Sequence, residues 1–209
     1  MVKGKLVVIE GIYGSGKLIV NLVEKLRTAL VTQGKNVYEI DSPDIGRAQI
    51  MGAQELSSRW CYGMFKPDFF FELASRARVC SVTRNELKQG KIVLCKNFTV
   101  SSIVYARLKG HDWFREDLNS LEARARGLHF GGEVVPDLTI FIDVPPEVAA
   151  HGLGEGNDNV FKSSDLVTQR DYYLDELSKM PGSKYKIIDA AQHEDQVLDK
   201  ALSEIQAIL

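Results

Sequence analysis

The sequence has no long apolar run and almost no net charge. No apolar stretch approaches the roughly 20 residues that a membrane-spanning helix needs. The first one, Leu6–Ile9, is bounded by Lys5 and Glu10, whereas a signal peptide needs roughly 7–15 apolar residues. With 26 Lys and Arg against 28 Asp and Glu, the formal charge is −2. We therefore expect neither membrane nor nucleic-acid binding, since both need a strong basic surface, and any anion site must be local.

Cysteine is also scarce. Cys61, Cys80 and Cys95 are odd in number, lie in apolar surroundings and have no C-x-x-C spacing. They are typical of reduced core thiols in a cytoplasmic protein, not of a disulfide framework. None of the histidines has the spacing of a zinc ligand relative to cysteines or acids, so no metal site is predicted.

Short β-branched segments alternate with amphipathic helices along the chain. The expected strands are 5–9, 36–40, 92–95, 138–142 and 185–188, and the expected helices are 18–30, 68–88, 100–108, 115–128 and 197–208. In the helix at 68–88, we expect one face to carry Leu73, Ala77, Cys80 and Leu87. This order predicts an α/β fold with a mostly parallel five-stranded sheet, helices on both faces and a ligand site at the carboxyl ends of the strands. We expect residues 1–209 to form a single domain, with a lid-like segment at about 150–165.

One glycine-rich loop matches a phosphate-binding motif. Gly11-Ile-Tyr-Gly-Ser-Gly-Lys17 follows a strand, opens a helix and has the spacing G-x-x-x-x-G-K. The glycines let backbone N–H groups turn toward an anion, and the helix N-terminus adds partial positive charge. The expected phosphate-binding residues are Gly11, Gly14, Ser15, Gly16, Lys17 and Leu18. The motif predicts the three-layer αβα fold of P-loop NTPases, with ATP as ligand and Lys17 as the catalytic cation; a strand-to-helix turn without a ligand is the alternative.

The position after the motif lysine departs from the pattern. The motif calls for Ser or Thr there, whose hydroxyl binds Mg²⁺, but the residue is Leu18. A leucine side chain cannot ligate a metal. Leu18 fits the apolar face of the following helix instead.

Together with other segments of the sequence, this loop resembles the thymidylate kinase family over nearly the full length of the chain. The family's opening loop is similar to residues 9–17, its Ser-Ser-x-x-Tyr segment to 101–105, and its fourth strand and exit to 136–147. This resemblance implies transfer of the γ-phosphoryl group of ATP to dTMP, and it implies a homodimer, which is common in the family. It also implies acceptor-binding roles for Arg76, Phe98, Ser101 and Tyr105.

The departures from the family lie at the reacting centre. Lys96 and Asn97 occupy the positions of the family's Asp-Arg pair, which organises Mg²⁺ and grips the acceptor phosphate. Tyr13 stands where the family usually has an acid, Glu72 where a phenylalanine stacks on thymine, and residues 151–169 contain no arginine. Asp41-Ser-Pro similarly replaces a segment that normally begins with an arginine near the acceptor phosphate.

Two readings of the function follow. Phosphoryl transfer depends on positioning and on positive charge around the γ-phosphate, so these losses predict impaired transfer to dTMP or another nucleoside monophosphate. The alternative is a catalytically inactive nucleotide-binding or scaffold protein on the same fold. Lys96 could replace Mg²⁺ beside Lys17, and Asp143 could substitute for the missing metal ligands. Arg76 could orient a base or be an ordinary surface residue.

Overall fold

A computed structural model of the chain describes residues 3–40, 65–108, 110, 115–127, 132–152, 163–182 and 184–209. Twelve elements follow one another in this part of the chain: β1 (Lys5–Gly11), α1 (Gly16–Thr32), β2 (Val37–Ile40), α3 (Phe65–Lys88), β3 (Ile92–Lys96), α4 (Thr99–Leu108), α5 (Arg115–Ala125), β4 (Leu138–Asp143), α6 (Pro146–Gly152), α7 (Ser163–Ser178), β5 (Tyr185–Asp189) and α8 (Glu194–Gln206). No described helix combines the length and the apolar character needed to cross a bilayer.

The five strands form one sheet in the order β2-β3-β1-β4-β5. Every described neighbour pair is parallel, so the predicted sheet is confirmed and is wholly parallel in this part of the chain. Such a sheet is buried on both faces, which explains why β1, β3 and β4 are apolar almost throughout. The central strand β1 ends at Gly11, which places the glycine-rich loop at the carboxyl edge where ligands bind in this architecture.

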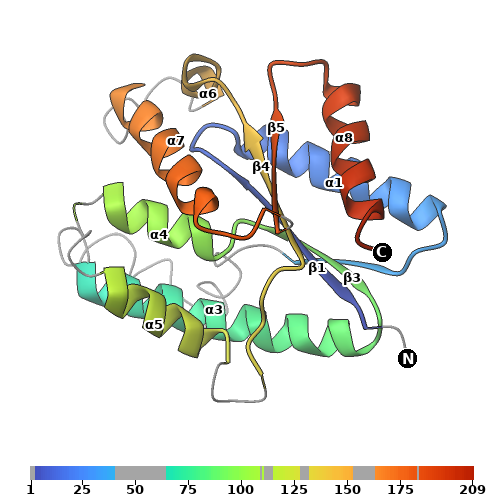
Figure 1. The fold of residues 1–209 in the computed structure, drawn as a ribbon, viewed down its shortest axis with the longest axis horizontal. Helices are drawn as coiled ribbons and strands as arrows, with labels where there is room; N and C mark the ends of the chain where they lie inside the picture. Colours follow the sequence, from blue (N-terminus) through green and yellow to red (C-terminus); the bar gives the residue numbers. More distant parts are fainter. Residues whose placement is uncertain are drawn as a thin grey trace, which may run out of the picture.

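The two sheet faces carry separate sets of side chains. In β1 and β3, Val7 and Leu94 belong to one buried cluster and Val8 and Cys95 to another, because successive side chains of a strand point to opposite faces. Helices α1 and α8 cover the first face, and α3, α4, α5 and α7 lie on the other side (Figure 1). The predicted three-layer arrangement is therefore present.

Two described helices, α6 and α7, were not predicted from the sequence. The limits of the other helices differ slightly from expectation, and one predicted face is partly wrong. Helix α5 ends at Ala125 rather than at residue 128, and α3 already begins at Phe65. In α3, Leu73 and Cys80 are buried as predicted, but Ala77 is exposed. Between them, Val79 faces inward together with two polar residues, Ser75 and Arg76, and Arg76 has no exposed surface. Apolar periodicity cannot identify a buried face that contains charged side chains.

Two of the three cysteines lie in the described interior. Cys80 and Cys95 are buried, and burial raises the pKa of the Cys80 thiol to about 11. A thiol with such a pKa is held in its protonated, unreactive form at neutral pH. Cys61 lies outside the described residues.

Because one side of α1 packs against the sheet, we expect substitutions on its two sides to differ clearly in their effect on stability. Leu26 has no exposed surface, whereas Val20 on the same helix is 46% exposed. We expect Leu26→Ala to lower the free energy of unfolding by about 3 kcal/mol, because it removes buried methyl groups and leaves a cavity. Val20→Ala should change it by less than about 0.5 kcal/mol. Urea denaturation measures both, and equal losses would contradict the assignment of the buried side.

Candidate functional site

The glycine-rich loop joins the end of β1 to the first turn of α1. Gly14 adopts a φ of 83°, in the left-handed region that glycine tolerates. The Ser15 hydroxyl and N–H group both donate to the carbonyl oxygen of Ile12, which closes a tight turn. The first N–H groups of a helix have no acceptor within it, so those of Gly16 to Leu18 are available to an anion. Lys17 is exposed beside them.

Helices α6 and α7 hold the loop from outside. A Cβ atom on Gly14 would overlap the carbonyl oxygen of Ala149, and one on Gly152 would overlap the carbonyl oxygen of Gly14. The N–H group of Tyr13 donates to Oε1 of Gln169 in α7 at 2.9 Å. The ends of the predicted lid-like segment, 150–152 and 163–165, therefore belong to helices, and residues 153–162 lie outside the described part.

Leu18 occupies its predicted place on the apolar side of α1. It is half-buried and packs against the main apolar cluster. Its side chain therefore contributes to packing and offers no oxygen to a metal ion.

The segment after β3 is fixed to β1 by two hydrogen bonds. Asn97 has a φ of 55°, a left-handed conformation that asparagine tolerates better than most residues. Its N–H group donates to the carbonyl oxygen of Ile9 at 2.9 Å, and the Phe98 N–H group donates to Oε1 of Glu10 at 2.8 Å. Ser101 donates its hydroxyl to the Phe98 carbonyl oxygen at 2.6 Å. The expected acceptor-binding residues Phe98 and Ser101 are thus held in place directly beside the end of β1.

Lys96 is paired with an acid on the neighbouring strand. Its Nζ atom lies 3.1 Å from Oε1 of Glu39 in β2, and its side chain is only 13% exposed. The same carboxylate lies within 3.8 Å of Arg27 Nε in α1. The hypothesis that Lys96 bridges phosphate oxygens would require it to leave or share this partner.

The carboxylate at the end of β4 is bound on both oxygens by an arginine. Arg170 in α7 donates from Nε to Oδ1 of Asp143 at 2.6 Å and from Nη2 to Oδ2 at 2.7 Å. This bidentate contact raises the pKa of Arg170 further above its ordinary value. Asp143 could replace the missing metal ligands, as considered from the sequence, only in competition with Arg170. Arg170 itself follows directly on the arginine-free stretch 151–169, and only the tertiary structure reveals its partner.

Arg76 is a buried residue and not a surface one. Its guanidinium group lies 3.4 Å from Oε2 of Glu122, donates from Nη2 to the Ser102 hydroxyl at 3.0 Å and stacks 4.4 Å from the centre of the Phe98 ring. Arg76 and Glu122 have no exposed surface. Unpaired burial of either charge would be costly, so the carboxylate compensates the arginine within the fold.

The expected residues of the sugar and base positions are only partly described. The rings of Tyr13 and Tyr105 meet edge to face, with centroids 6.5 Å apart and planes at 64°. This contact joins the glycine-rich loop to α4. The side chain of Glu72, and Asp41 with its neighbours, lie outside the described residues.

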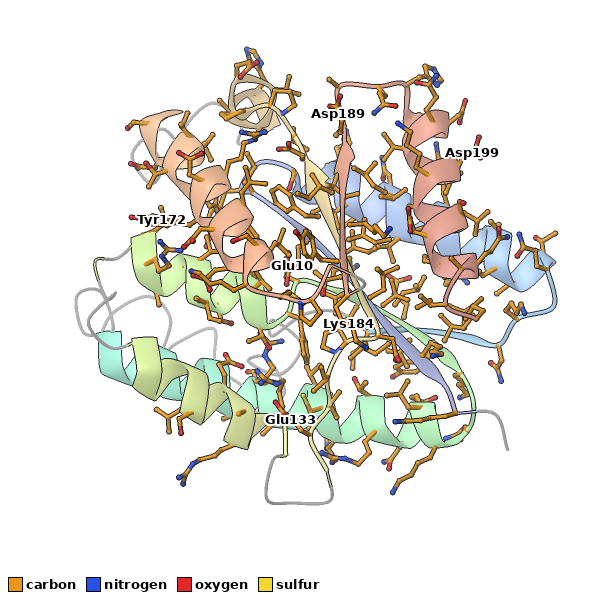
Figure 2. All side chains as sticks on the ribbon, in the orientation of Figure 1. Glu10, Glu133, Tyr172, Lys184, Asp189 and Asp199 are labelled. Carbon is orange, nitrogen blue, oxygen red and sulfur yellow. The ribbon has the colours of Figure 1, made fainter. Side chains whose placement is uncertain are left out.

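Glu10 is a buried carboxyl group between the glycine-rich loop and the helices. Among the described residues, it is the one carboxyl group whose pKa is raised into the neutral range. Burial raises its pKa from 4.5 to about 7, opposed by the Phe98 N–H bond and by the charge of Arg76. The Tyr173 hydroxyl donates to Oε2 at 3.4 Å. Figure 2 shows Glu10 in the interior, where the sheet meets α4 and α7. Sequence reasoning did not single out this residue, because a lone acid at a strand end carries no signal of its partners.

The comparisons with known proteins agree with the arrangement. The family model described as thymidylate kinase matches residues 9–201. A "Probable thymidylate kinase" of Methanosarcina mazei is 26% identical, over 97% of this chain and 96% of its own length. "Thymidylate kinase" proteins of Ligilactobacillus salivarius and Desulfovibrio desulfuricans are 27% and 30% identical, over 96% and 97% of this chain and 97% and 95% of their own lengths.

The raised pKa of Glu10 predicts a pH-dependent stability. The folded protein holds the Glu10 proton up to about pH 7, whereas the unfolded chain releases it near pH 4.5. The stabilisation from the protonated carboxyl is therefore complete below pH 4.5 and is lost as the pH rises through 7, a change of about 3 kcal/mol. We expect Glu10→Gln to flatten the dependence of the unfolding free energy on pH in this window. Glu24 is an exposed residue of α1, and Glu24→Gln should leave this dependence as in the wild type. Urea denaturation across the window measures this, and superimposable profiles would contradict the assignment.

The close approach of α6 to the loop predicts that Gly152 cannot be replaced. We expect Gly152→Ala to lower the free energy of unfolding by about 1–3 kcal/mol, because its Cβ atom would displace either α6 or Gly14. Gly182→Ala is the control, because its Cβ position has no atom within 4 Å among the described residues other than its chain neighbours, and its effect should stay within about 0.5 kcal/mol. Thermal or urea unfolding compares the two, and a neutral Gly152→Ala would rule out the tight contact.

Proposed function

Since the chain belongs to the thymidylate kinase family, we propose that it binds ATP at the loop from Gly11 to Leu18 and transfers the γ-phosphoryl group to dTMP or another nucleoside monophosphate at a strongly reduced rate. Thymidylate kinases are nucleotide-binding transferases that use ATP with Mg²⁺. The residues that surround the loop are the reason for the expected reduction.

The observation that carries the proposal is the pair between Asp143 and Arg170. Each carboxylate oxygen of Asp143, at the end of β4, accepts a hydrogen bond from the guanidinium group, so a cation bound there would have to compete with Arg170. Leu18 supplies no hydroxyl, and Lys96 places a positive charge where the family has a carboxylate. These residues do not fit Mg²⁺, which requires oxygen ligands in near-octahedral geometry.

The remaining residues support binding more than transfer. Backbone N–H groups at the start of α1 and the ammonium group of Lys17 can neutralise the terminal phosphates of ATP. Beyond binding, the rate of phosphoryl transfer depends on fixed cations around the transferring group. Asn97 carries no charge, and Arg170 is committed to Asp143. An arginine at this point is worth about 10³–10⁵ in turnover in related enzymes, which sets the scale of the expected loss.

A nucleotide-binding protein without transfer is the second candidate. It is favoured by the buried pair of Arg76 and Glu122. The family resemblance assigns Arg76 to the acceptor base, yet here its charge is compensated inside the protein and its side chain is covered. Acceptor binding through Arg76 would require this pair to open.

Two further expectations stay proposals. A single domain over residues 1–209 is supported by the family match across 9–201. A homodimer, as commonly formed in the family, stays a prediction.

A coupled assay with Mg²⁺·ATP and a panel of nucleoside monophosphates tests the proposed function. We expect the wild type to turn over at least about 10³-fold below the 1–100 s⁻¹ typical of kinases. The variant Leu18→Ser/Lys96→Asp/Asn97→Arg, which restores the family's residues, should raise the rate at least about tenfold. Val20→Ser, an exposed change on α1, serves as the control. Turnover by the wild type at the family's ordinary rate would contradict the reduction.

Thermal unfolding with and without ATP separates the two candidates. A ligand that binds only the folded state raises the melting temperature, so ATP should stabilise the wild type under both candidate functions. If ATP raises the melting temperature but neither the wild type nor the triple variant turns over, the non-catalytic candidate is favoured. If no nucleotide changes the melting temperature, both candidate functions are contradicted.

A further inference from the structure

The side chain of Gln169 in α7 reaches the backbone of the glycine-rich loop. Oε1 of Gln169 accepts the Tyr13 N–H group at 2.9 Å, across 156 positions of sequence. Gln169 is only 4% exposed. Tyr13 directly precedes Gly14, where the loop passes through its left-handed turn.

Gln169 is a polar residue on the buried face of a helix. Leu166, Tyr173 and Leu177 lie three before, four after and eight after it, and each has 0–1% exposed surface. Residues at this spacing share one side of a helix. A buried amide costs free energy unless it is hydrogen-bonded, and the bond to the loop satisfies the side-chain carbonyl of Gln169.

The neighbouring residue fixes this turn of α7 at the site. Arg170 binds both oxygens of Asp143 at the end of β4, which leaves Gln169 little freedom to move along the sheet edge. On the opposite side, Gly14 is in close contact with Ala149 of α6. The peptide between Ile12 and Tyr13 is therefore held in its plane from α7 while Gly14 is confined by α6.

We propose that Gln169 is a positioning residue of the phosphate-binding loop: its side-chain carbonyl orients the Tyr13 peptide and thereby the N–H groups from Gly14 to Leu18 toward a bound phosphate. This inference rests on the proposed binding of a nucleotide at the loop. The physical basis is preorganisation, because donors already aimed at the anion lose no ordering free energy on binding. Without Gln169, the loop would have to find the same conformation when the ligand arrives.

The test compares Gln169→Met with Val167→Met in the full-length protein. Methionine keeps the length of glutamine and removes the acceptor; Val167 is 49% exposed on the same helix and serves as control. We expect the Kd for ADP and for inorganic pyrophosphate, measured by calorimetry, to rise about tenfold in Gln169→Met, as for loss of one preorganising hydrogen bond. Val167→Met should bind as the wild type does.

A second measurement needs no ligand. We expect amide hydrogen exchange at Tyr13 to accelerate in Gln169→Met, and the amide resonances of Gly14 to Leu18 to shift. Gln169→Glu retains an oxygen acceptor and should restore the protection of the Tyr13 amide. Rescue by this variant is not expected if Gln169 only fills space.

The outcomes separate this inference from the proposed function. If the wild type binds ADP and Gln169→Met binds equally well, with only a lower melting temperature, the positioning role is overturned and nucleotide binding stands. If the wild type binds neither ADP nor pyrophosphate, the proposed function fails. The positioning role is then decided by the ligand-free amides: unchanged resonances from Gly14 to Leu18 in Gln169→Met overturn it, and shifted ones support it.

Discussion

The hydrogen bond from the Phe98 N–H group to the buried carboxyl group of Glu10 joins the two segments that make up the candidate site. Glu10 precedes the glycine-rich loop, and Phe98 follows Lys96 and Asn97. The left-handed backbone at Asn97 is held by this bond and by the adjacent bond to Ile9. A carboxyl group buried at this depth is costly when charged. Its protonation, the course of the segment after β3 and the packing of Arg76 over Phe98 are consequently coupled.

Charge around the loop is largely compensated inside the protein. Lys96 is paired with Glu39, Arg170 with Asp143 and Arg76 with Glu122. In each pair, the attraction that could act on a phosphate or a metal is directed to a protein partner instead. Since phosphoryl transfer depends on cations fixed around the transferring group, this arrangement supports the proposal that the loop binds a nucleotide and that transfer is slow.

The sequence predicted the architecture well because its signals are local. Strands of β-branched residues and leucines at helical spacing were correctly assigned, and the phosphate motif was placed at the carboxyl edge of β1. The buried face of helix α3 was predicted less well. Its inward positions include Arg76 and Thr83, so a search for apolar periodicity selected Ala77, which is exposed. A polar residue is assigned to a surface by default, and only its partner shows otherwise.

The sequence by itself therefore determined the five strands, five of the seven described helices and the turn of the glycine-rich loop, since each depends on neighbouring residues and their backbone preferences. Helices α6 and α7 were not predicted. The tertiary structure alone decided which side chains meet at the site. Gln169 reaches Tyr13 across 156 positions, and Arg170 reaches Asp143 across 27. Such contacts depend on how α7 packs against the sheet. The sequence around a polar side chain in a helix does not indicate which distant atom the side chain will bind.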